Sequence, residues 1–191
     1  MSGDTYYHLS VAILFGGREP MLLGAMPDLP EDNEDDWAFG QRFSVEPEEP
    51  IDVSIREGHE VHEPLHFYTQ AVASQAFVDA LLEAGVDNLD TYDVVLRSRT
   101  DPTFTIGGYK ALNVIGLVGA VGPGGVYLVD LMGDPRKDAS DFDPQSAKRL
   151  YMFRRRGNFM LVVHQRVKDH LQAKGFDDLE FTQLTDELRF S

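Results

Sequence analysis

The sequence predicts an α+β fold, built mostly from antiparallel sheet with few helices, on three observations. Short runs rich in β-branched and aromatic residues recur along the chain between Gly and Pro turns. Apolar residues at helical spacing precede two glycines, Gly85 and Gly175. These glycines belong to two similar units of helix, glycine and strand, because residues 75–90 and 165–180 share Gln, Asp, Leu, Gly, Asp and Leu at matching positions. A short amphipathic helix needs a sheet to cover its apolar side, so each unit predicts a helix packed on strands.

The first third of the chain predicts one strand and then loops. The run YYHLSVAILF, residues 6–15, has strand composition and ends at two glycines. Residues 18–64 hold most of the ten prolines and form an acidic, Pro-rich loop segment, with short strands expected at 41–45 and 51–55. Trp37 and Phe39 are expected to anchor this segment to the body.

The rest of the chain predicts the two units and the strands between them. Ser74 is a favourable helix N-cap, and Gly85 stands where a helix C-cap needs positive φ, so a helix lies between them and a strand continues to about Leu96. Further strands are expected at 109–118 and 125–132, followed by a hairpin that turns at 157–158. The second helix is expected over 165–174, with a strand over 179–184.

Length and composition predict a single domain over residues 1–191. The chain has 42% hydrophobic residues, enough to bury a core. It has no cysteine, which excludes disulfides, thiolate metal sites and a cysteine nucleophile. The N-terminal sequence lacks the basic region of a signal peptide, and its apolar run is too short to span a membrane, so a cytoplasmic location is expected.

The net charge of −15 is concentrated in one stretch. Residues 28–63 contain 13 Asp and Glu against Arg42 and Arg56, a local net charge of −11. Such a field repels nucleic acid and anionic membranes and speeds association with a basic protein. The other interpretation is that the acidity only keeps the protein in solution. If it serves binding, the expected partner contacts are Asp32, Glu34, Asp35, Asp36 and Trp37, with Glu46, Glu48 and Glu49 as a second patch.

The stretch GHEVHEPLHF offers an alternative function. His59, Glu60, His62, Glu63 and His66 are five possible metal ligands within eight residues. A proline between the last two histidines prevents the helix on which zinc ligands commonly stand four residues apart. The alternative is therefore a metal-binding protein or metal-dependent enzyme built on an extended histidine cluster, whereas the leading prediction includes no metal and no cofactor.

The remaining motifs predict no catalysis. The glycines between 116 and 125 lack the Lys and Ser or Thr of a phosphate-binding loop, and residues 134–146 lack the glycine and glutamate of a calcium loop. A G-x-S-x-G nucleophile motif is missing from the sequence. The three arginines 154–156 precede the predicted hairpin turn and are expected to solubilise a sheet edge or to pair with the acidic segment. The sequence thus favours a non-enzymatic binding protein.

Three stretches carry a family resemblance. They are FVDALLEAGVDNLDTYDVVL, GYKALNVIGLV and RLYMFRRRGNFMLVVHQRVKDHLQAKGFDDLEF, and together they resemble the immunity protein eleven family of bacterial polymorphic toxin systems over about residues 70–182. The acidic segment 18–64 is not part of the match. The resemblance implies a cytoplasmic protein that neutralises a cognate toxin by binding it, and it brings no catalytic residues. A scaffold protein without a toxin partner is a third possibility that the sequence leaves open.

Overall fold

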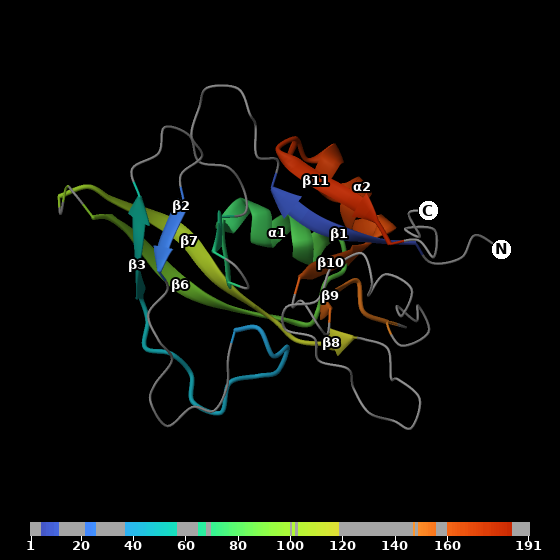
Figure 1. Cartoon of the computed structure of the whole chain (residues 1–191), viewed down its shortest axis with the longest axis horizontal. Coiled ribbons are helices and arrows are strands. Elements are labelled where there is room, and N and C mark those ends of the chain that lie inside the picture. Colours follow the sequence, from blue (N-terminus) through green and yellow to red (C-terminus); the bar gives the residue numbers. More distant parts are fainter. Residues whose placement is uncertain are drawn as a thin grey trace, which may run out of the picture.

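The computed structural model contains two helices and two mostly antiparallel sheets within the residues that it describes (Figure 1), which confirms the predicted α+β class. The structure describes residues 5–11, 22–25, 37–56, 65–67, 70–99, 101, 103–118, 147, 149–155 and 160–184. The five-stranded sheet has the order β11-β1-β10-β9-β8, and its strands are β1 (Tyr6–Val11), β8 (Leu117–Val118), β9 (Met152–Arg155), β10 (Leu161–His164) and β11 (Leu179–Gln183). The six-stranded sheet has the order β2-β3-β6-β7-β5-β4, and its strands are β2 (Leu22–Ala25), β3 (Ile51–Arg56), β4 (Leu65–Phe67), β5 (Gln70–Ser74), β6 (Leu89–Ser98) and β7 (Thr105–Val114). The helices are α1 (Gln75–Glu83) and α2 (Gln165–Ala173).

Most predicted elements lie where the sequence placed them, with one wrong and three missed. Residues 41–45 were expected to form a strand, but they are irregular. The strands β2, β4 and β5 were not expected. The strand predicted at 125–132 and the hairpin turn at 157–158 lie outside the described residues, although β9 and β10 on either side of that turn do pair antiparallel. No helix among the described residues combines the length and the apolar character that crossing a membrane requires.

The two helices begin in the same way, ninety residues apart. The Ser74 hydroxyl accepts a hydrogen bond from the backbone N of Phe77, 3.2 Å away. The imidazole of His164 takes the same position at α2 and accepts from the backbone N of Arg166, at 3.1 Å. Each side chain satisfies one of the backbone N–H groups that the first turn of a helix leaves without a partner.

The two helices also end in the same way. Gly85 and Gly175 have φ of 97° and 86°, in the left-handed region that favours glycine. After α1, the N–H of Val86 donates to the carbonyl oxygen of Leu81 over 3.0 Å. After α2, the N–H of Phe176 donates in the same way to the carbonyl oxygen of Leu171, and both residues lie ninety positions further on. This hydrogen bond across six residues is the Schellman type of C-cap.

The similarity extends to the central strand, which lies between the two strands of each unit. In the first unit β7 lies between β5 and β6, and Lys110 of β7 pairs with Ala73 on one side and Asp93 on the other. In the second unit β1 lies between β10 and β11, and Tyr7 of β1 pairs with Val163 on one side and Gln183 on the other. These two partners lie ninety positions after Ala73 and Asp93, the partners of Lys110. Each unit is therefore a split β-α-β motif with the same register, although the central strand follows the first unit and precedes the second.

The two units share one hydrophobic core between their helices. The rings of Phe77 and Phe176 pack edge to face with centroids 5.0 Å apart. At the surface above them, the Glu83 carboxylate lies 2.6 Å from the Lys174 ammonium and 3.2 Å from the His170 imidazole. These hydrogen bonds, that of Lys174 first, lower the pKa of Glu83. Both helices are thus held together by apolar packing below and ionic contacts above.

A second core lies on the other face of the six-stranded sheet. Neighbouring residues of β7 point to opposite faces: Leu112 belongs to the core under α1, and Ala111 belongs to the second core. The end strands β2 and β4 contact each other, so the sheet curves strongly around this second core. Its buried members come from both the sheet and the loop segment before β3: Trp37, Phe43, Ile51, Val53, Ile55, Val72, Tyr92, Val94, Leu96 and Ala111.

The expected role of the arginines in β9 needs correction. Arg154 and Arg155 are 1% and 6% exposed, so neither solubilises an edge. The reason is topological, because β8 pairs with β9 in parallel and β10 pairs with it on the other side, which makes β9 an inner strand. Arg155 also contributes, after burial, to lowering the pKa of His8 to about 4. Arg156 lies outside the described residues.

Candidate functional site

The candidate site is the segment of residues 37–50, which leads into β3 and lies at the bottom of Figure 1. Its apolar side chains Phe39 and Val45 are 41% and 46% exposed. The carboxylates of Glu46, Glu48 and Glu49 are exposed beside them. Exposed apolar groups surrounded by acidic groups on one segment form a surface suited to a protein partner with basic side chains.

Aromatic packing fixes this segment to the six-stranded sheet. Trp37 and Phe43 are buried, and their rings meet edge to face at 4.9 Å. Tyr92 of β6 lies under both, 5.8 Å from each ring centroid. Edge-to-face and stacked ring pairs each stabilise a fold beyond their buried area. The loop is therefore attached through its side chains to a regular strand.

Backbone contacts fix the segment in a second direction. Gly40 has φ of 66°, and a Cβ atom on it would stand 2.8 Å from the backbone of Gly116, so only glycine fits. The carbonyl oxygen of Gly40 accepts a hydrogen bond from the Gly116 N–H over 2.7 Å. The side-chain amide of Asn113 donates to the carbonyl oxygen of Gln41 at 2.9 Å. The Gln41 carbonyl, at the start of the stretch that was expected to form a strand, thus bonds to a side chain and not to the backbone of a neighbouring strand.

Carboxylates of the segment and of β6 gather around Tyr92. Burial first, and then the charges of Asp90, Glu46 and Glu49, raise the pKa of the Tyr92 phenol to about 12, while Arg42 acts in the opposite direction. The Arg42 guanidinium lies 2.7 Å from the Asp90 carboxylate, which orients this pair at the edge of the surface. Three carboxylates therefore act together on this one ring.

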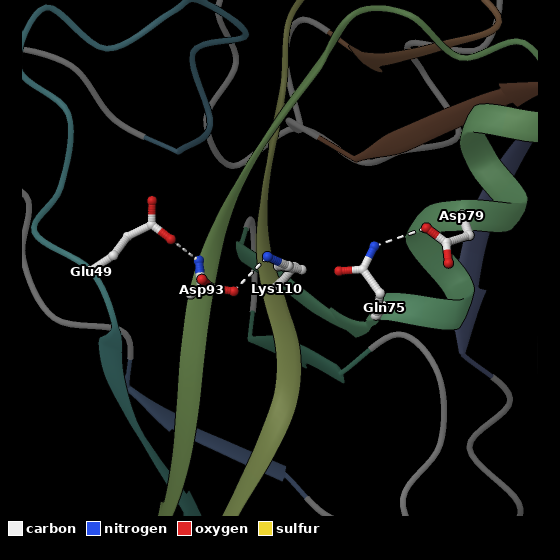
Figure 2. Close-up of polar contacts among 5 residues, drawn as sticks. All are labelled: Glu49, Gln75, Asp79, Asp93 and Lys110. Atoms are coloured by element: carbon white, nitrogen blue, oxygen red, sulfur yellow. Dashed lines mark hydrogen bonds and ion pairs between the residues drawn. The ribbon is translucent and has the colours of Figure 1, made fainter.

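A row of polar contacts continues from the segment across the sheet (Figure 2). The Glu49 carboxylate accepts a hydrogen bond from the backbone N of Asp93 in β6, and the Asp93 carboxylate pairs with Lys110 in β7. Beyond Lys110, the side chain of Gln75 at the start of α1 donates to Asp79 over 2.8 Å. Glu49 is thus held by the backbone of β6.

The structure places some of the residues that the sequence predicted as partner contacts, and one of these residues is buried. Glu46, Glu48 and Glu49 lie together and exposed, whereas Asp32, Glu34, Asp35 and Asp36 lie outside the described residues. Trp37 is 3% exposed and packs in the second core, so its assignment as a partner contact is corrected. The anchor role expected of both aromatics holds for Trp37 alone. Phe39 is exposed and takes its place in the candidate surface.

Sequence reasoning also missed Asp90. The residue is adjacent to the candidate surface only because Arg42, 48 positions earlier in the chain, reaches it. No local pattern signals a contact of that separation.

The histidine cluster falls mostly outside the description. His59 and His62 are among the residues that the structure does not describe, and His66 is placed only as a member of β4. Among the described residues, no three His, Asp or Glu side chains are arranged as ligands of a metal ion. The metal alternative therefore stays a prediction from the sequence.

Comparison with known proteins adds no assignment. No protein-family profile matches the chain, and no curated protein matches it. The class of protein is consequently argued from the surface described above and from the family resemblance of residues 70–182.

Proposed function

We propose that this chain is a non-enzymatic binding protein that neutralises a basic bacterial toxin in the cytoplasm, as an immunity protein of a polymorphic toxin system. The observation that carries the proposal is the fixed segment 37–50, on which exposed Phe39 and Val45 stand among carboxylates that gather around Tyr92. The family resemblance supplies the class of partner. The local net charge of −11 over residues 28–63 supplies the complementary sign.

The proposed mechanism is occlusion of the toxin's cationic site. The acidic field raises the association rate by attracting a basic partner, and the exposed apolar side chains slow dissociation by losing contact with water. The aromatic packing and the bonds from Gly40 and Gln41 hold the segment in one conformation, so binding requires little ordering of the chain. Asp35 and Asp36, which lie outside the described residues, would extend the same field.

Charge neutralisation at the surface tests the proposal. The probe is the toxin domain encoded beside this chain's gene, purified in an inactive form. The double variant Glu46→Gln and Glu48→Gln removes two charges and leaves Glu49, whose carboxylate bonds to β6. We expect association to slow by about two- to tenfold at low salt, with a weaker dependence on salt concentration.

A matched control separates this effect from total charge. Asp177→Asn with Glu180→Gln removes the same two charges next to α2 and β11, away from the candidate surface. This control should associate at the unaltered rate. Equal slowing in both variants would show that only net charge matters. In cells, growth that the active toxin domain arrests should be restored by the unaltered chain, and failure of that rescue would contradict neutralisation.

A further inference from the structure

A second candidate contact lies at the other end of β6, where the β6–β7 hairpin extends beyond its neighbours. When the two units are aligned, the last residue of β11 corresponds to Asp93, but β6 continues beyond Asp93. Likewise Tyr6, the first residue of β1, corresponds to Tyr109, but β7 begins four residues earlier, at Thr105. Residues 94–99, 101 and 103–108 are therefore an addition to the first unit, called here the hairpin extension. Figure 1 shows it projecting from the sheet, away from the helices and from segment 37–50.

The tip of the hairpin extension is ordered by its own polar groups. The Asp101 carboxylate accepts from the backbone N and the hydroxyl of Thr103, at 2.9 and 2.6 Å, and these bonds, the hydroxyl's first, lower its pKa. The backbone N of Asp101 donates to the Ser98 hydroxyl over 3.0 Å. Two backbone bonds between Ser98, Asp101 and Phe104 close the turn. A short side chain that bonds its own backbone in this way is typical of a fixed turn.

A bulge sets the direction of the tip. Leu96 pairs with Ile106 and Val94 pairs with Tyr109, so two glycines, 107 and 108, face a single residue of β6. Gly108 has φ of 81°, and the positions of a Cβ atom on either glycine are open. A bulge with a left-handed glycine bends a strand and re-aims the side chains beyond it. The extension is thus both curved and fixed.

The side chain that this tip presents is apolar. Phe104 is 46% exposed, between the exposed side chains of Thr103 and Thr105. Nearby on the extension, Arg97 pairs with Asp52 of β3.

We propose that the hairpin extension is a second contact element, which inserts the Phe104 ring into an apolar pocket of the protein partner. The inference rests on the proposed function for the existence of that partner. An ordered, projecting aromatic ring loses little conformational freedom on binding, and aromatic anchors in pockets account for most of the energy of typical interfaces. A protein pocket is favoured over a membrane surface because the strongly acidic chain is repelled by anionic lipid.

Dissociation kinetics with the same inactive toxin domain test the proposal. Phe104→Ala should speed dissociation at least about tenfold and leave the salt dependence of association unchanged, because the group removed is neutral. Phe104→Leu, which keeps apolar volume, should show a smaller increase. Leu82→Ala is the matched control, since Leu82 of α1 is 51% exposed and belongs to neither surface. Thermal unfolding should be unchanged in all three.

The outcomes separate this proposal from the proposed function. A dissociation rate for Phe104→Ala within twofold of the unaltered chain would overturn the hairpin contact alone, provided that the chain binds the toxin domain. A chain that does not bind the domain at all would overturn both. If Phe104→Ala instead abolishes binding to vesicles of anionic lipid and leaves toxin binding intact, the partner of this ring is a membrane and the proposal is wrong.

Discussion

The strongest test of the site's architecture is replacement of Trp37 by alanine. The structure makes Trp37 a core residue that fixes an exposed loop, so the change should act on stability first. A buried tryptophan removes about 150–250 Å² from water, which at about 25 cal/mol per Å² corresponds to about 4–6 kcal/mol. Part of that burial remains with alanine, and measured changes of this kind are about 3–5 kcal/mol.

This loss is a large share of the stability of an ordinary domain, about 5–15 kcal/mol. It should appear in urea unfolding followed by far-UV circular dichroism, because the substitution removes the only tryptophan and with it the fluorescence signal. Phe39→Ala is the matched control, since it is an aromatic of the same segment that is 41% exposed. The control should change stability by no more than about 0.5 kcal/mol. Equal effects of the two variants, or a loss below about 1 kcal/mol for Trp37→Ala, would refute the assignment of Trp37 to the core.

Three further predictions follow from single groups. The pKa of Tyr92 is raised to about 12, above the value of about 10 that an exposed phenol has in the unfolded chain. Because the unfolded state loses its proton first, the free energy of unfolding should fall between about pH 10 and 12. Urea unfolding of Tyr92→Phe over the same pH range should show a smaller fall. Asn88 donates to the carbonyl oxygens of Ile115 and Met152, the latter at 2.8 Å, and so joins the chain after β7 to β9; Asn88→Ala should lower the free energy of unfolding by about 1–3 kcal/mol, and an unchanged urea midpoint would contradict that role. Protein purified without a histidine tag should contain no stoichiometric zinc, iron or manganese, and stoichiometric metal that His62→Ala removes would replace the proposed function with the metal alternative.

The sequence predicted best those elements that local chemistry determines. Ser74 and Gly85 mark the ends of α1 because a hydroxyl and a left-handed glycine satisfy helix ends whatever surrounds them. The strand expected at 41–45 was wrong for the opposite reason, since the carbonyl oxygen of Gln41 bonds to the side chain of Asn113, 72 positions later in the chain. Partners at that distance leave no trace in a local pattern.

The candidate site was predictable in its charge and not in its arrangement. The excess of acidic residues named Glu46, Glu48 and Glu49, which the structure places together on the surface. Composition does not distinguish Trp37 from Phe39, two positions apart, although one is buried and the other exposed. Trp37 is buried against Tyr92 of β6, a residue far from it in the sequence. Burial in an irregular segment is decided by the surface that covers it.

The duplication gives a reason to look for function where the two units differ. Their common parts, the caps, the glycines and the register around the central strands, are all explained by packing a helix on a sheet. The first unit carries two additions among the described residues: segment 37–50 with β3 beside β6, and the hairpin extension beyond the last match with β11, whereas the second unit's sheet continues through β9 to β8. Both additions keep aromatic side chains exposed on fixed backbone, Phe39 and Phe104, which stability does not require. Under the proposed function both rings are partner contacts, which a scaffold without a partner would lack.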